Sequence, residues 1–476
     1  MLSEFLLISL PMFSDFEHHI KKVAMEFKQW PLDAKICVVS NLDADGICSG
    51  SIVVKMLQRA NRPHTVKIIH QLKEEVIQEL AKEPFEYFIF SDLGSGQLVN
   101  VNRYLGDRKI LVLDHHQLQG EPGANMLHIN PLPFDVDGSG EICASGVAFL
   151  FAREVDDKNE DMAHIAIVGA IGDVQESDGF TGVNNLILEI AKKHHLIQVE
   201  KGLKFFGLQT RPIHKLLEYS SDMKVPGITG SESGAIQFLQ TLGINPKKDS
   251  RWKTFGDLTK EEVQRLTAAI ILKKGEDQNP EAIFTKVYTL PAEEVGSPLR
   301  DAKEFSTLLN ACGRLNKASL GMGACLNDPE LKKLALQEML VYRKALVKAL
   351  NWFDANKDSS KVFKTDKFMI INAEKNILAT MIGTTASILS RGGSFPQGYI
   401  ILSMAQNIDH TTKISLRVVG DGESIDCKDL VCKMVEQSAG EAGGHKHAAG
   451  AVIPTDKEEE FIQEAKDILS KASNKV

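Results

Sequence analysis

Short apolar runs alternate with helical patterns between residues 35 and 153. The runs are rich in β-branched and aromatic residues, as buried strands usually are, and read KICVVS, VKIIH, YFIFS, KILVL and MLHIN. Helical patterns stand at about 48–59 and 144–153. Strands that alternate with helices in this way predict an α/β fold, with a parallel sheet covered by helices on both faces.

The rest of the chain follows two other patterns. Residues 193–355 carry long amphipathic helical stretches and few strand signals, whereas the region after the polar stretch NKDSSK at 356–361 is again β-rich. We therefore predict a sheet domain at 14–192, a helical insert or connector at 193–355 and a smaller C-terminal α/β domain at 362–472. A length of 476 residues also favours several domains, because one hydrophobic core rarely grows that large.

Composition narrows the class of protein. Hydrophobic residues make up 43% and charged residues 25%, and no apolar run is long enough for a membrane span. The initial MLSEFLLISLPMF lacks a basic leader, so we expect a packing segment and not a signal peptide. Seven scattered cysteines without a C-x-x-C pair predict reduced thiols and a cytoplasmic location. The net charge of −8 argues against a wholly basic nucleic-acid coat but not against a local basic groove.

Polar residues follow three of the predicted strands. The carboxyl ends of parallel strands share one edge of a sheet, so these side chains should converge there. A further carboxylate, in GDVQESDG, ends an apolar helical stretch and would arrive from another element. The candidates are Asp43 and Asp45 in NLDADG, Asp92 after YFIFS, Asp114, His115 and His116 after KILVL, and Asp173.

Most of these motifs also have a simpler interpretation when taken alone. Asp43 and Asp45 could form a solvated turn, Asp92 could cap the next helix, and Asp173 could be an ordinary helix terminus. An acid followed by two imidazoles at the end of a buried strand is harder to explain by structure, because burying these groups carries a desolvation cost. One imidazole can bind a metal while a neighbouring carboxylate orients it.

Several carboxylates with an imidazole indicate a hard, octahedral divalent site better than a tetrahedral zinc site. We expect Mn²⁺ first and Mg²⁺ second. Two such ions, roughly 3.5–4 Å apart, suit the hydrolysis of phosphate esters. In the C-terminal region, GGHKHAAG offers amide groups and the imidazoles of His445 and His447 near Arg417, which would make an anion-binding wall, although such a glycine segment alone is more often a turn.

In this order the motifs NLDADG, SDLGSG, LDHH, GDVQESDG, KISLR and GGHKHAAG resemble the DHH phosphoesterase superfamily, and within it the archaeal RecJ-like single-strand-specific exonucleases. The resemblance spans about 35–455 and includes TRPIHKLLEYSSDMKVPGITG. It implies a DHH catalytic domain, a helical insert and a DHH-associated nucleic-acid-binding domain. The implied roles are metal ligation by Asp43, Asp45, Asp92, His116 and Asp173, with Asp92 bridging two Mn²⁺ ions, support from Asp114 and His115, and backbone or phosphate binding by Arg417, Gly443, Gly444 and His445.

One position departs from the resembled family, which commonly has His or Asp two residues before the first motif aspartate. Here that residue is Asn41, whose amide oxygen is a poorer ligand, so that either one metal binds weakly or Asn41 lies outside the ligand shell. Three functions therefore stay open. The leading one is an exonuclease acting on single-stranded DNA or RNA in replication or repair; the alternatives are a catalytically weakened scaffold that associates with GINS and the replicative helicase, and a small-nucleotide phosphodiesterase, against which the long insert argues.

Overall fold

The computed structural model describes residues 11–176, 179–220, 223–274, 279–420, 425–436, 438, 440–446 and 448–473. The chain divides into two compact units, Met1–Met339 and Leu340–Val476. Most of the apolar patch at the start of the chain lies outside the described residues. Among the described helices, none is long and apolar enough to cross a membrane. All seven cysteines are free.

The first unit is built on a five-stranded sheet in the order β2-β1-β3-β4-β5, in which all neighbours run parallel. This confirms the prediction of a parallel sheet. Ser40 of β1 pairs with Ser91 of β3, which pairs with Leu113 of β4, so the chain leaves three adjacent strands at the same level. The strands are β1 (Ile36–Asn41), β2 (His64–Ile69), β3 (Tyr87–Ser91), β4 (Lys109–Leu113) and β5 (Met126–Ile129).

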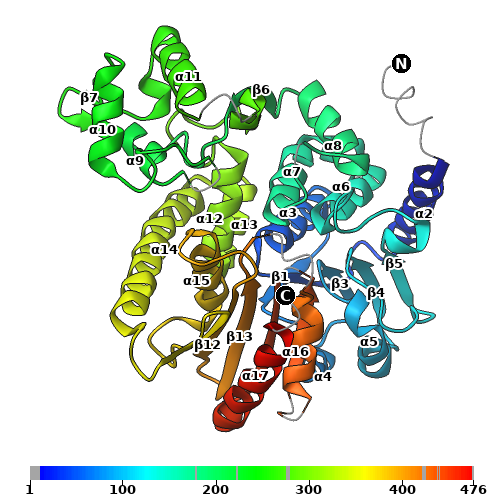
Figure 1. Ribbon diagram of the computed structural model, residues 1–476. Coiled ribbons are helices and arrows are strands. Elements are labelled where there is room, and N and C mark those ends of the chain that lie inside the picture. The colour runs from blue at the N-terminus through cyan, green and yellow to red at the C-terminus, as the bar shows by residue number, and fades with distance from the viewer. Residues whose placement is uncertain are drawn as a thin grey trace. The chain divides into compact units, whose positions relative to one another are not determined.

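Helices cover both faces of this sheet. On one side α3 packs against α6 and α7, and on the other α4 and α5 share a core with alternate residues of the strands, such as Val39, Phe90 and Val112 (Figure 1). The helix α7 is apolar almost all round because α3, α6, α8 and α12 pack against it. The helices are α2 (Pro11–Lys28), α3 (Ala44–Arg59), α4 (Glu74–Ala81), α5 (Leu98–Leu105), α6 (Ala144–Val155), α7 (Ala163–Gly172) and α8 (Gly182–Lys193).

The middle of the chain contains helices, as predicted, but also strands that the sequence did not indicate. The strands β6 (Gln198–Leu203) and β9 (Phe284–Thr289) form an antiparallel ribbon, and β7 (Lys247–Lys248) pairs with β8 (Arg251–Trp252). Residues between 203 and 283 have their own hydrophobic core, whereas α12 and α13 pack against α3, a helix that covers the first sheet. The helices are α9 (Ile213–Glu218), α10 (Glu232–Thr241), α11 (Lys260–Lys274), α12 (Ala302–Arg314), α13 (Ala318–Cys325) and α14 (Pro329–Asn356).

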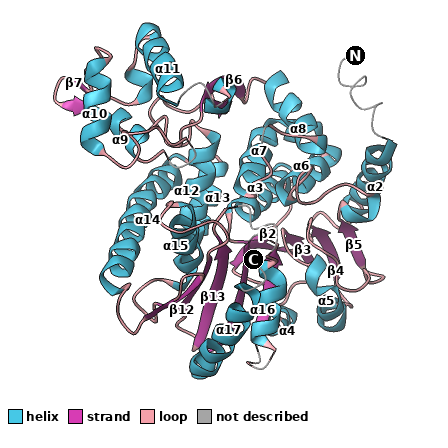
Figure 2. Ribbon diagram, in the orientation of Figure 1, coloured by secondary structure: helices cyan, strands magenta, loops and turns pink. Residues whose placement is uncertain are grey.

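The second unit is a mixed six-stranded sheet in the order β10-β11-β12-β13-β15-β14. The helices α16 and α17 share a core with one face, and α15 packs on the other (Figure 2). The C-terminal α/β region is therefore confirmed. Its elements are β10 (Val362–Lys364), β11 (Phe368–Asn372), α15 (Ala379–Arg391), β12 (Ile400–Gln406), β13 (Thr411–Val418), α16 (Cys427–Val435), β14 (Glu441–His445), β15 (Ala448–Pro454) and α17 (Glu458–Ser473).

The glycine-rich segment GEAGGHKHAAG is not the loop that the sequence predicts. Residues Glu441–His445 form the edge strand β14, which pairs antiparallel with β15. Gly443 pairs with Gly450, and Gly444 has a φ of +134° that only glycine adopts readily. Small residues on both strands allow close approach of the two backbones, which explains how so glycine-rich a segment can join a sheet.

Candidate metal centre

The structure brings the predicted residues of the first unit together at the carboxyl edge of its sheet. Asp43 follows β1, Asp92 follows β3, and the Asp-His-His motif follows β4. Asp45 lies in the first turn of α3, and Asp173 directly follows the last residue of α7. The sheet therefore supplies one wall of the site, and the other is supplied by α3, which packs on the sheet, and by α7, which packs on α3.

Asp45 is held from behind by the start of α6. Its two carboxylate oxygens accept hydrogen bonds from the N–H groups of Ala144 at 2.8 Å and Ser145 at 3.0 Å. Free N–H groups at a helix N-terminus favour a negative charge, so they fix this buried carboxylate without a cationic side chain. Gly169 on α7 leaves the necessary space, because a Cβ there would lie 2.7 Å from Asp45 Oδ1.

Asp43 and Asn41 are both engaged by the backbone of their own loop. Asp43 is the N-cap of α3, and its Oδ1 accepts a hydrogen bond from the N–H of Gly46 at 3.0 Å. The amide oxygen of Asn41 accepts from the N–H of Leu42 at 2.6 Å. Asp43 lies on the exposed side of the site, where its charge still acts on Asp92. Asp43 belongs to neither of the tightest groups of His, Cys, Asp and Glu side chains that could hold a cation.

Asp92 is the most unusual carboxylate in the site. It is only 2% exposed, its φ is +60°, and its Oδ1 has no hydrogen-bond partner among the described residues. Burial raises the pKa of Asp92 well above its ordinary value, and the nearby charge of Asp43 raises it further. A buried carboxylate oxygen that lacks a donor destabilises a fold unless something else, such as a cation, binds it.

Asp114 is equally buried but fully satisfied. Its oxygens accept from the N–H of Ser95 at 2.8 Å, the N–H of His115 at 2.8 Å and Nδ1 of His116 at 2.8 Å. Burial alone would raise the pKa of Asp114, but the charge and hydrogen bond of His116 hold it well below its ordinary range. The ionised carboxylate can only accept, so Nδ1 of His116 carries a proton and its Nε2 remains as the metal-binding nitrogen.

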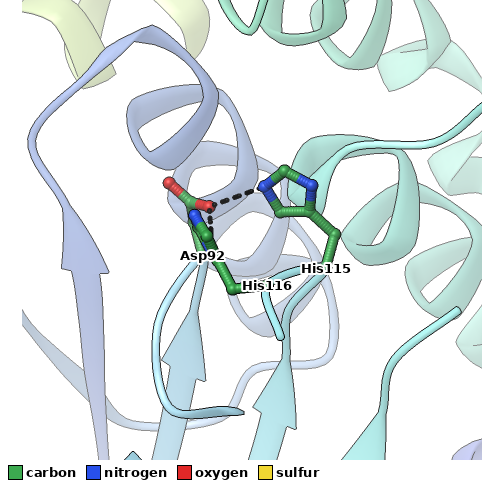
Figure 3. Close-up of side chains that lie close together, drawn as sticks. All are labelled: Asp92, His115 and His116. Carbon is green, nitrogen blue, oxygen red and sulfur yellow. Dashed lines mark ion pairs between the residues drawn. The ribbon is translucent and has the colours of Figure 1, made fainter. Parts of the chain in front are cut away.

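The orientation of His115 is set by a main-chain carbonyl. Nδ1 of His115 lies 2.6 Å from the oxygen of Gly138, and since that oxygen can only accept, Nδ1 is the donor. Nε2 then lies 3.5 Å from Asp92 Oδ1 and 4.0 Å from Asp45 Oδ2. Figure 3 shows one carboxylate oxygen of Asp92 joined by ion pairs to both His115 and His116. Burial lowers the pKa of His115, but Asp92 and the other acids raise it well above its usual value.

Asp173 closes the site from α7. Its Oδ2 lies 3.9 Å from Nδ1 of His115 and accepts a hydrogen bond from Nε2 of Gln175 at 2.8 Å. The same amide group of Gln175 also donates to the oxygen of Gly138 at 2.8 Å, so one side chain links Asp173 to the carbonyl that orients His115. Burial raises the pKa of Asp173 to about 7, and the charges of Asp45 and Asp43 contribute.

Two overlapping groups of side chains could hold a cation. In each group the candidate ligand atoms all lie within 4.8 Å of one another. The groups are Asp92 with His115 and His116, and Asp45 with His115 and Asp173. Buried carboxylates with raised pKa values and an unbonded oxygen on Asp92 fit a divalent cation, because the ion would supply the missing positive charge.

The sequence did not indicate the residues that support this site from behind. The hydroxyl of Ser95, whose N–H binds Asp114, lies 2.9 Å from Nε2 of His128 and accepts from Nδ2 of Asn130 at 3.0 Å. Nδ2 of Asn130 also donates to the oxygen of His116 at 2.9 Å. Ser95 and Gln175 stand inside the motifs LGSG and GDVQ, and Asn130 directly follows β5. Their closeness to the predicted site residues was therefore the one feature of the sequence that could have indicated a supporting role.

In the second unit, the predicted substrate-binding residues lie in one sheet. Arg417 on β13 pairs with Ala448 of β15, which pairs with His445 of β14, so the three form a row across the strands. Nη1 of Arg417 donates to the oxygen of Leu416 at 2.7 Å, and its Nε donates to the hydroxyl of Ser387 at 2.9 Å. His447 and the side chain of His445 lie outside the described residues.

Three family models match separate parts of the chain. They are the DHH family, N-terminal domain, at residues 35–172, the DHH-CID domain at 205–283 and the DHHA1 domain at 366–471. An uncharacterized protein of Methanocaldococcus jannaschii is 30% identical over 472 residues, which cover 94% of this chain and 97% of the relative.

Solved structures share the fold at low sequence identity. RecJ from Thermus thermophilus in complex with Mn²⁺ superposes with a TM-score of 0.59 and 16% identity over 95% of this chain, which spans 55% of that RecJ. CDC45 from Entamoeba histolytica superposes with a TM-score of 0.60 and 12% identity, over 96% of this chain and 98% of that one. At identities as low as these, the similarity to RecJ and CDC45 is a similarity of fold alone.

Proposed function

This chain belongs to the DHH superfamily of phosphoesterases, and on that basis we propose that it hydrolyses phosphodiester bonds of single-stranded DNA or RNA with two divalent cations. The observation that carries the proposal is the buried acidic cluster at the carboxyl edge of the first sheet. Asp92 and Asp173 have raised pKa values, and Asp92 Oδ1 has no hydrogen-bond partner among the described residues. Such a cluster is stabilised when cations bind it.

The proposed ligands follow from the two overlapping groups. Asp45, His115 and Asp173 would hold one ion, and Asp92 with His116 would hold the second, with Asp92 between them. His115 therefore enters the ligand set directly, in addition to the supporting role that the sequence suggested. Carboxylates with imidazole favour Mn²⁺, and Mg²⁺ is the second choice. When bound, such ions lower the pKa of a bound water and polarise the phosphoryl group.

The chain's own residues orient these ligands before substrate binds. The start of α6 fixes Asp45, the carbonyl of Gly138 fixes the tautomer of His115, and Asp114 fixes that of His116. Gln175 fixes Asp173. Because four of the five proposed ligands are held by a hydrogen bond from the fold, little rearrangement of these four remains to be made when the cations and the phosphate enter.

The proposed substrate is a single nucleic-acid strand, cut from one end. Support comes from the fold shared with a structure named exonuclease RecJ bound to manganese, with a TM-score of 0.57 and 16% identity over 95% of this chain and 94% of that one. In the second unit, Arg417, Gly443, Gly444 and His445 would bind the backbone of the strand. Arginine suits phosphate because its planar group presents several donors.

The test is nucleotide release from end-labelled single-stranded DNA and RNA, with duplex DNA for comparison, in Mn²⁺, in Mg²⁺ and in chelator. We expect stepwise shortening of single strands that requires metal and that Asp92→Asn abolishes. The matched control is Asp157→Asn, which removes an exposed acid outside the site and should leave the rate unchanged. A wild-type protein that binds single strands but cleaves neither polymer in either metal would contradict the proposal.

A second candidate, a catalytically weakened scaffold for replication proteins such as GINS, is favoured by one observation. The amide oxygen of Asn41 is already bonded to the N–H of Leu42, so it has less capacity to bind an ion. The variant Asn41→Asp separates the two candidates, because a carboxylate there should raise both Mn²⁺ affinity and hydrolysis if weak metal binding limits the wild type. A rate that is high in the wild type and unchanged in the variant would exclude the scaffold interpretation of Asn41.

A further inference from the structure

The helix α7 ends with two characteristic backbone hydrogen bonds just before the metal centre. The N–H of Val174 donates to the oxygen of Ile171 at 3.1 Å, and the N–H of Gln175 donates to the oxygen of Ala170 at 2.9 Å. This pair of bonds defines a Schellman motif, in which the residue after the C-cap adopts the left-handed conformation and is usually glycine. Here that residue is Val174, with a φ of +59°.

Five other described helices end with the same pair of bonds, which allows a direct comparison within one molecule. They are α3, α8, α10, α12 and α13, and the equivalent residues are Asn61, His195, Gly243, Asn316 and Asn327. Glycine, asparagine and histidine are the types that tolerate this conformation. Valine is β-branched, and its Cβ substituents clash with the backbone there. Val174 is therefore the exception among six matched positions.

Nothing in the described part of the fold compensates for this strain. The side chain of Val174 is 78% exposed, so it gains little from packing. The reversal of the chain is useful, because it turns Gln175 back to hold Asp173, but glycine would allow the same reversal without strain. Strained residues concentrate at functional sites, and this one stands between Asp173 and Gln175. The side chain, rather than the backbone conformation, is what needs a functional explanation.

We propose that the side chain of Val174 contacts the nucleotide bound at the metal centre and is a specificity-determining residue. The inference rests on the proposed function. The neighbouring ligands are carboxylates and imidazoles, which offer no aliphatic surface, whereas a base or a sugar ring presents apolar faces. An exposed isopropyl group can pack on such a face, and it adds no negative charge that would repel the phosphate.

The test compares Val174→Gly with Val174→Ile and with the control His195→Gly, which makes the same kind of change at the equivalent position of α8. Each protein is assayed for thermal unfolding, for kcat and KM on single-stranded oligomers, and for the Mn²⁺ concentration of half-activation. We expect Val174→Gly to unfold at a higher temperature than the wild type. Its KM should rise about fivefold, because one partial apolar contact with the substrate is lost, and its kcat should be unchanged. Val174→Ile should keep the wild-type KM, and His195→Gly should not alter it.

The outcomes separate the inference from the function on which it rests. A wild type that cleaves oligomers, together with a Val174→Gly variant of unchanged KM, overturns the inference alone. A shift in the half-activating Mn²⁺ concentration in Val174→Gly also overturns it, because the residue would then act by holding Asp173. A wild type that cleaves no oligomer overturns the proposed function and the inference with it. An oligomer that lacks its terminal base should show a smaller difference between Val174→Gly and the wild type.

Discussion

The two sheets of this protein differ in how far the fold itself provides bonding partners for the charged side chains of their candidate functional residues. At the carboxyl edge of the first sheet, acidic groups are buried, and one oxygen of Asp92 accepts no hydrogen bond from the described residues. In the second sheet, Arg417 is half-buried, and its guanidinium is bonded by the chain itself, to the oxygens of Leu416 and Ala449 and the hydroxyl of Ser387. The first region holds unbalanced charge, and the second holds a charge that is already supported.

This difference determines whether a substitution should change the stability of the protein or only its binding of an anion. Charge that the fold does not balance destabilises the protein until a ligand binds, so substitutions there should change stability even without substrate. A supported, partly exposed cation should matter only when an anion is present, and then modestly. Four predictions test the contrast, and they run from the largest expected effect to the smallest.

The largest effect is expected for Asp92→Asn. Hydrolysis should fall by more than about a hundredfold, since even the outer partners of a metal ligand are worth that much. In chelator the variant should nevertheless be more stable than the wild type, by about 1 kcal/mol or more, because it removes a buried carboxylate whose Oδ1 accepts no hydrogen bond. Urea unfolding of both proteins in chelator measures this. A variant less stable than the wild type would show that the surrounding residues already stabilise the carboxylate of Asp92 in the absence of metal.

Asp114→Ala should behave in the opposite way, although it is a neighbour in the same site. This substitution should destabilise the fold, because the N–H of Ser95, the N–H of His115 and Nδ1 of His116 would all lose their acceptor. The loss should be about 2–4 kcal/mol in urea unfolding with chelator present. Asp157→Ala is the control, and equal stability of the two variants would refute the prediction.

The metal-free protein should lose stability as pH rises towards neutrality. Asp173 has its pKa raised to about 7 in the fold, whereas an unfolded aspartate has a pKa of about 3.9. Between these values the folded state binds more protons than the unfolded state, so its stability falls with rising pH and levels off above the folded pKa. Asp173→Asn should flatten this slope in chelator. An unchanged slope would mean that other groups produce it.

The sequence predicted the fold and the family because the relevant signals are local. YFIFS and KILVL indicate buried strands, and the acids that follow them lie at one edge of the sheet whatever the rest of the chain does. The parallel sheet, the C-terminal α/β region and the resemblance to the DHH superfamily are confirmed. The edge strand β14 was missed, because a segment so rich in glycine gives no strand signal until its partner is known.

The finer structure of the site depends on distant parts of the chain. The tautomer of His115 is set by the carbonyl of Gly138, 23 residues away in the sequence, so nothing local distinguishes the roles of His115 and His116. Asp45 is fixed by N–H groups about a hundred residues further on. The ribbon of β6 and β9 joins segments separated by a whole helical region. Contacts of this kind follow from tertiary packing, and periodicity in the sequence does not carry them.

The smallest effect is expected for Arg417→Lys in the second sheet. Lysine keeps the charge but cannot reproduce bonds to Leu416 O, Ala449 O and Ser387 Oγ at once, so a phosphate would meet a less well oriented cation.

KM for single-stranded oligomers should rise about tenfold or less, with kcat unchanged and stability within about 0.5 kcal/mol of the wild type. Lys428→Met, which removes an exposed charge on α16, is the control for general electrostatic attraction. If Arg417→Lys instead destabilises the substrate-free protein as much as Asp114→Ala does, the guanidinium is part of the fold's own hydrogen bonding. The two sheets would then not differ in the way proposed.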